Sequence, residues 1–124
     1  MIAVSGAVAT YLFGGWSALL GILLAFVAFD YLTGVLASAA DGELSSTVGL
    51  IGIAKKVAIF TLVAVMHLVD TAIGDAHLFR DATIFFYLAN ELLSILENTG
   101  RLGIPLPDVV QDAVKALKGQ VKKS

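Results

Sequence analysis

The sequence contains no cysteine and few charged side chains, and both absences limit what the chain can be. Without cysteine, the chain can form neither a disulfide bond nor a thiolate metal site. Charged residues make up only 15% of the 124 residues, and hydrophobic residues make up 58%. A soluble chain of this length buries too little of its surface to hide so many apolar side chains. The composition therefore predicts a membrane protein.

Basic side chains are absent from the chain before Lys55. A secretion signal begins with a positively charged segment, so we do not expect the first apolar run to be a cleaved signal. No basic stripe or basic segment interleaved with aromatic residues is present, and nucleic acid is therefore not an expected partner.

Three apolar segments predict an all-α membrane protein with three transmembrane helices, at about residues 7–36, 55–73 and 82–99. A spanning helix needs about 20 residues, which the first run exceeds and the other two reach only with flanking polar residues. The apolar patch within residues 44–54 is too short to span and predicts an interfacial or re-entrant segment. We therefore expect a transmembrane domain at 1–104 and a tail at 105–124.

The distribution of basic residues predicts the orientation. With three spans, the loop that carries Lys55 and Lys56 lies on the same side as the tail, and only Arg80 lies on the other side. The positive-inside bias then places the N-terminus outside and the C-terminus in the cytoplasm, with Lys55 and Lys56 at the interface.

The tail predicts a cytoplasmic amphipathic helix. Acidic side chains precede the lysines, which suits the helix macrodipole. The charges are too scattered for a polybasic lipid-binding cluster, so packing against neighbouring helices is the preferred interpretation. The residues that share its apolar face are Val109, Val110, Ala113, Val114, Leu117 and Val121.

The third apolar segment carries a stripe of polar side chains at helical spacing. A lone membrane helix could not hide these groups from lipid, so the stripe should meet protein or water. The alternative is a helix that ends near Asn90, which would leave the following residues in solvent. The stripe consists of Thr83, Tyr87, Asn90, Glu91, Ser94, Glu97 and Asn98.

Small residues recur along one face of the first segment, at Ser17, Gly21, Ala25 and Ala28. This spacing lets helix backbones approach closely, either within the chain or between two copies. The stripe and the small face together supply the candidate residues for self-association or for facing a pore.

Asp30 is the only charged residue between Ala7 and Ala40. Insertion of a central Asp costs about 2.5–3.5 kcal/mol, and the surrounding apolar side chains offset this cost. A position near the cytoplasmic end, within reach of Lys55 or Lys56, would cost less, but energetics alone leave mid-membrane and interface positions open. Asp30 is therefore a further candidate residue for self-association or for facing a pore.

No enzyme is expected, because we find no nucleophile–base pair, no phosphate-binding glycine loop and no paired carboxylates with a pocket. Two histidines and two carboxylates at His67, Asp70, Asp75 and His77 match no familiar zinc spacing. They are interpreted as a helix end and a polar turn. Neither catalytic residues, nor a metal site, nor a cofactor is therefore predicted.

Several motifs, taken in order, resemble the phage-lysis and toxin-secretion holin family. They are a D-x-x-T-G element, an L-S-S…G-x-x-G-x-x-K-K loop, an N-E-x-x-S-I-x-E-N stretch and G-x-P-x-P, between about residues 29 and 118. The residues that match are Asp30, Thr33, Gly34, Leu44, Ser45, Ser46, Gly49, Gly52, Lys55, Lys56, Asn90, Glu91, Ser94, Ile95, Glu97, Asn98, Gly103, Pro105 and Pro107.

The resemblance implies a small multi-pass protein of the bacterial host's cytoplasmic membrane. Such a protein forms homo-oligomers in the lipid bilayer and opens lesions at a set time. Its cargo would be an endolysin, for host cell lysis, or a toxin, for secretion. Two alternatives stay open: a membrane anchor that recruits a partner without forming a pore, and a small ion channel subunit that uses Asp30 and Glu91.

Overall fold

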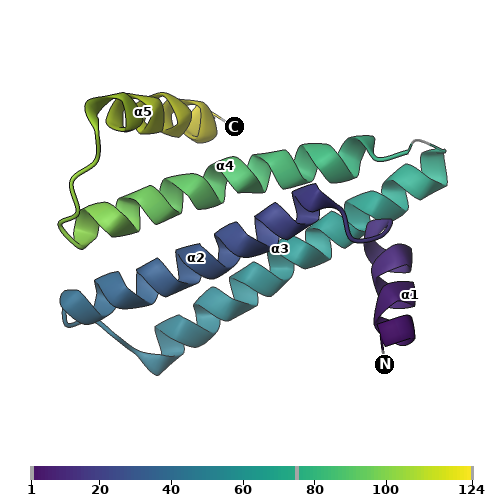
Figure 1. Ribbon diagram of the computed structural model, residues 1–124, viewed down its shortest axis with the longest axis horizontal. Helices are drawn as coiled ribbons and strands as arrows, with labels where there is room; N and C mark the ends of the chain where they lie inside the picture. Colours follow the sequence, from purple (N-terminus) through teal and green to yellow (C-terminus); the bar gives the residue numbers. More distant parts are fainter. Residues whose placement is uncertain (1, 75, 124) are drawn as a thin grey trace.

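The computed structural model describes residues 2–74 and 76–123, and the regular structure in these ranges is α-helical throughout (Figure 1). The all-α fold class predicted above is confirmed. The five helices are α1 Ile2–Phe13, α2 Ala18–Ala40, α3 Ser46–Ile73, α4 Leu78–Arg101 and α5 Asp108–Lys123.

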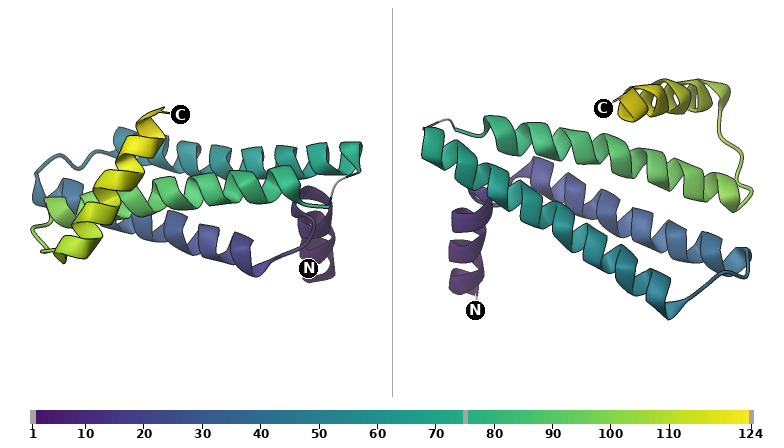
Figure 2. Two further views of the ribbon diagram at one scale, coloured as in Figure 1. Left: turned by 90° about the horizontal axis from the view of Figure 1, so that it is seen from above. Right: turned by 180° about the vertical axis from the view of Figure 1, so that it is seen from behind.

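The first apolar run is not one helix over 7–36, as the sequence suggested, but two helices with a break between them. Gly14 and Gly15 have φ angles of 77° and 102°, which other residues rarely adopt, and they end α1. Ser17 then caps α2, because its hydroxyl accepts a hydrogen bond from the backbone of Leu20 at 3.1 Å. As a result α1 projects away from the other helices (Figures 1 and 2).

The second apolar segment begins at Ser46 rather than near Lys55, so residues 46–54 are not a separate re-entrant segment, whereas their position at the membrane interface stays a prediction. Residues 46–54 are the first turns of a continuous α3. Ser45 caps this helix through the backbone N–H of Val48. Gly74, with a φ of 79°, ends it in the left-handed conformation.

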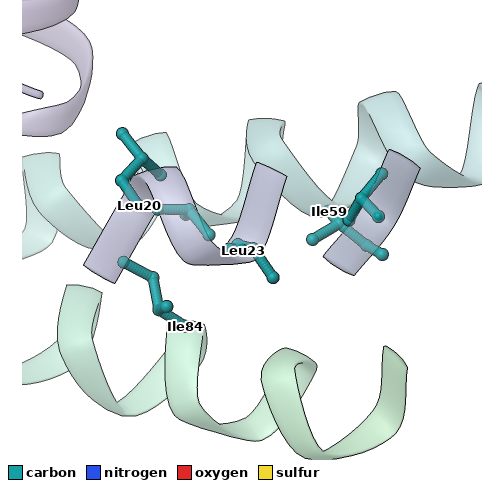
Figure 3. Packing of buried hydrophobic residues seen from close by; sticks show 6 residues of the cluster. Leu20, Leu23, Ile59 and Ile84 are labelled. Carbon is teal, nitrogen blue, oxygen red and sulfur yellow. The ribbon is translucent and has the colours of Figure 1, made fainter. Parts of the chain in front are cut away.

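Helices α2, α3 and α4 form an antiparallel bundle in which α4 contacts both of the others (Figure 1). The core cluster is apolar, and its side chains converge between the three helices (Figure 3). Helices α2 and α3 contact each other much less, and they diverge toward the loop that joins them (Figures 1 and 2). The cluster comprises Leu20, Leu23, Val27, Ile59, Val63 and Ile84.

The outside of the bundle exposes large apolar side chains, as a bilayer environment requires. Helices α2 and α3 are long and apolar enough to cross a membrane. Helix α4 is long enough to span, but it carries several charged residues. The third span therefore stays a prediction. Examples of the exposed side chains are Phe29, Leu32, Leu36, Leu50, Ile51, Val57 and Val65.

The tail folds back beside α4 as helix α5 (Figures 1 and 2). Lys118 Nζ lies 2.7 Å from Glu97 Oε1 of α4, in an ion pair that is half exposed. Val110, Val114 and Leu117 are partly buried, whereas Val109 is 80% exposed. The side chain of Val121 lies outside the described residues. The cytoplasmic position of the tail stays a prediction.

Candidate functional site

Three charged side chains from three different helices meet inside the bundle. Lys56 of α3 donates hydrogen bonds to Asp30 Oδ2 of α2 and to both carboxylate oxygens of Glu91 on α4, at 3.1 and 2.9 Å for the latter. The two carboxylates are 7% and 3% exposed, and Lys56 is 20% exposed. We call Asp30, Lys56, Glu91 and the adjoining Asn98 the ion cluster.

Asn98 completes the ion cluster from the last turn of α4. Its amide Nδ2 donates to Asp30 Oδ1 at 3.0 Å, to the Asp30 carbonyl at 3.2 Å and to Thr33 Oγ1 at 3.1 Å. Gly34 allows this approach, because a Cβ at that position would lie 3.4 Å from the same nitrogen. Asp30 is therefore bonded to both α3 and α4.

The ion cluster holds two carboxylates and one ammonium group, so its formal charge is negative. Burying charges costs several kcal/mol per ion unless they are paired and hydrogen-bonded, as they are here. Ionisable groups inside a membrane bundle face its interior and pair with one another. The arrangement fixes the relative positions of α2, α3 and α4.

The expected proximity of Asp30 to a lysine of the following loop is confirmed for Lys56, whereas Lys55 is exposed. Asp30 lies near the middle of α2, and its depth in the membrane stays open. Lys56 lies well inside α3 rather than at its first turn, where the predicted helix at 55–73 placed it. The contact forms inside the bundle because α3 begins at Ser46, before the apolar segment predicted at 55–73.

The polar stripe of the third segment divides into two parts. Glu91 and Asn98 are buried against α2 and α3, while Asn90 and Glu97 are exposed on the side where α5 lies. The alternative in which the helix ends near Asn90 was wrong, since α4 continues to Arg101. Thr83, Tyr87 and Ser94 are partly buried, and whether any of these side chains faces a pore stays a prediction.

The small face of α2 is only partly covered by the rest of the chain. Ser17 serves as the N-cap of α2. Gly21 lies against Trp16 of the same chain, and a Cβ added at Gly21 would lie 3.4 Å from Trp16 Nε1. Ala25 is partly buried, and Ala28 is exposed. Self-association through this face stays a prediction.

A second polar region lies at the other end of the bundle, in the stretch interpreted above as a helix end and a polar turn. Asp70 is buried, and its two carboxylate oxygens accept the backbone N–H groups of Phe79 and Arg80 at 2.8 and 2.9 Å. His77, at the start of α4, makes no capping bond with its side chain. Asp70 therefore caps α4 from α3, in place of a local capping residue.

Arg80 connects the same region to α1. Its Nη1 donates to the Phe13 carbonyl at 2.7 Å, and its Nε donates to Asp81 at 2.9 Å. The rings of His67 and His77 lie 6.1 Å apart. Within 2–74 and 76–123 no group of side chains is arranged to hold a metal ion, and Asp75 lies outside these ranges.

The sequence profile of the bacteriophage holin family matches residues 7–119. The chain belongs to this family. The resemblance stated above from the ordered motifs is thereby confirmed at the level of the family. Membership, together with the two long apolar helices, indicates a membrane protein with the role of a holin, from a family without enzymatic activity.

Several relatives of this holin-family chain match over nearly all of its length. An uncharacterized protein of Halalkalibacterium halodurans is 44% identical over 98% of this chain and 93% of its own. One of Listeria innocua is 51% identical over 88% of this chain and 78% of its own. The uncharacterized protein YqxH of Bacillus subtilis is 32% identical over 92% of this chain and 81% of its own. No solved structure is significantly similar to the chain.

Proposed function

We propose that this protein is a holin that accumulates in the host cytoplasmic membrane, self-associates and opens lesions through which an endolysin or a toxin passes. In this proposal α2, α3 and α4 span the bilayer, with the N-terminus outside and the C-terminus in the cytoplasm. The lipid bilayer and further copies of the chain are its partners, and the endolysin is released cargo.

One observation carries the proposal: a bundle with an apolar exterior encloses charged and amide side chains that come from all three of its helices. In a single chain these groups pair and hydrogen-bond with one another, which lowers the cost of placing them in lipid. When copies associate, the polar side of α4 can instead face water between them. Asn90 and Glu97 already lie on the outside of the bundle, where a second copy can reach them.

The test is inducible expression in a bacterial host together with a cytoplasmic endolysin, with the membrane potential followed by a dye. A holin collapses the potential abruptly and releases the endolysin into the wall, so that the culture lyses. Endolysin expressed alone is the control. Unchanged growth and potential at high membrane levels of the protein would refute the proposal, and loss of potential with the endolysin retained would identify a small ion channel.

A non-pore membrane anchor is distinguished by the tail. Deletion of residues 108–124 removes α5 and with it the surface that an anchor would use to recruit a partner. We expect lesion formation to persist in the deleted chain with altered timing, because the ion cluster does not include α5 residues. Wild-type protein at the same membrane level is the reference.

A further inference from the structure

A cleft lined by both polar and apolar side chains opens between α2 and α3 at the end where these helices diverge. Its volume is about 220 Å³, and it leads from the α2–α3 loop inward to the ion cluster. Gly49 and Gly52 line it, and Cβ atoms added there would lie 3.3 Å from the Tyr31 hydroxyl and 3.5 Å from the Tyr31 ring, respectively. Its polar lining includes Ser38, Glu43, Ser45, Ser94, Asn98 and Arg101.

A second cleft lies between α3 and α4, on the other side of Lys56. Its volume is about 830 Å³, and Lys118 of α5 lines it together with Asn90 and Glu97. Both clefts are lined by Asp30, Lys56 and Ser94, so they converge on the ion cluster from two sides of α3. The 20% exposure of Lys56 is consistent with this access.

Between the ion cluster and the second polar region, at Asp70 and Arg80, the interior is apolar. The core cluster fills the space between the helices toward the other end of the bundle, where Leu23, Val63 and Ile84 are fully buried. Apolar side chains offer no hydrogen bonds to water, so a polar path from the loop end stops at the ion cluster. The first cleft therefore opens at the α2–α3 loop end and does not continue past the ion cluster.

We propose that the folded single chain carries a one-sided vestibule, through which water and small hydrated ions reach Lys56 from the α2–α3 loop end. Water there solvates the net negative charge that two carboxylates and one ammonium group give the ion cluster. A dry membrane interior would make this charge costly. The vestibule lies within one chain and is distinct from any lesion between copies. It rests on the insertion of α2 and α3 in the bilayer, not on lesion formation.

The absence of native cysteine allows a direct test by single-cysteine labelling in sealed membrane vesicles. The thiol reagent is a membrane-impermeant methanethiosulfonate, applied separately to right-side-out and inverted vesicles that retain a trapped fluorescent dextran. Retention of the dextran shows that no lesion is open. Ser94→Cys, a near-isosteric change at the point where the clefts converge, is the test variant, and Glu43→Cys marks the side of the loop.

Two variants serve as controls for depth and packing. Phe29→Cys lies beside Asp30 in the sequence, but its side chain is 54% exposed on the outer surface of α2, where lipid would surround it. Val63→Cys lies in the sealed apolar part. Because the thiolate is the reactive species and needs water, we expect Ser94→Cys to react at least about tenfold faster than either control.

The side of reaction is the second criterion. Ser94→Cys should be labelled from the same face of the membrane as Glu43→Cys, whichever face that is. Labelling as slow as that of Val63→Cys, or labelling from the opposite face, would overturn the proposal. If Ser94→Cys does not accumulate in the membrane, Ser38→Cys on the wall of the first cleft replaces it with the same expected results.

Discussion

The two polar regions of the bundle stabilise it in different ways. In the ion cluster, charged side chains of α2, α3 and α4 pair with one another, and the carboxylates of Asp30 and Glu91 share the single ammonium group of Lys56. At the other end, the carboxylate of Asp70 binds backbone N–H groups of α4, and the Arg80 guanidinium binds a backbone carbonyl of α1. The first region therefore couples helices by charge, whereas the second completes helix ends. Substitutions should separate these two kinds of interaction.

The largest effect is expected from Lys56→Met, which removes the ammonium group and leaves two buried carboxylates without a cationic partner. Breaking a buried ion pair on one side costs about 3–5 kcal/mol. The free energy of unfolding, followed by circular dichroism in detergent, should fall by about this amount. Lys55→Met is the matched control, since that neighbouring lysine is exposed. Equal losses in the two variants would show that the ion cluster does not stabilise the bundle.

Removal of the carboxylates should then reverse this loss. Asp30→Asn and Glu91→Gln, combined with Lys56→Met, replace an uncompensated charged site with neutral groups that still form hydrogen bonds. We expect the triple variant to be more stable than Lys56→Met alone in the same unfolding assay. A triple variant that is less stable would mean that the carboxylates contribute through contacts other than those with Lys56.

The second largest effect is expected from Asp70→Ala. The loss of a helix cap that makes two hydrogen bonds costs about 2 kcal/mol, because buried N–H groups of α4 lose their acceptors. The unfolding assay in detergent should report this loss, and amide hydrogen exchange should accelerate at Phe79 and Arg80. Thr71→Ala is the control, since its hydroxyl bonds only to His67 within its own helix. Unchanged exchange at the start of α4 would contradict the capping role.

A smaller effect is expected at the junction of α1 with the bundle, where two adjacent glycines allow a paired test. Both have positive φ angles, so an alanine is strained at either position. At Gly14 an added Cβ would also lie 2.8 Å from His67 Cε1, whereas at Gly15 it would meet nothing within 4 Å. Gly14→Ala should therefore cost about 1 kcal/mol more than Gly15→Ala.

Unfolding in detergent measures this difference, and limited proteolysis shows whether α1 is released. If both alanine variants lose the same stability, the packing of Gly14 against His67, His77 and Arg80 does not hold α1 in place.

The smallest effect is expected from Arg101→Ala at the same end of the bundle as the α2–α3 loop. Arg101 Nη2 lies 2.9 Å from Asp41 Oδ2, but both side chains are about 40% exposed. Exposed ion pairs contribute about 0.2–1 kcal/mol and are screened by salt. The loss should therefore stay below about 1 kcal/mol and disappear at high salt. A loss as large as that of Lys56→Met would remove the distinction between buried and surface pairs.

Several features of the fold could be predicted from local patterns. Apolar runs identified helical segments, and the charged residue Asp30 with the lysines after it indicated an ion pair. The break after Phe13 was missed because hydropathy averages over Gly14 and Gly15, although two consecutive glycines were a signal for it. The start of α3 was missed because Gly49 and Gly52 suggested a loop, whereas they provide space for Tyr31.

Composition and apolar runs alone indicate a membrane protein, and the ordered motifs point to the holin family. The partners of the polar side chains, by contrast, are set by the tertiary structure. Spacing along one helix showed that Glu91 and Asn98 lie on a common face, but their partners Asp30 and Lys56 belong to other helices. The same holds for Asp70 and α4. Such pairings depend on where each helix begins and how the helices are aligned, which no local pattern specifies.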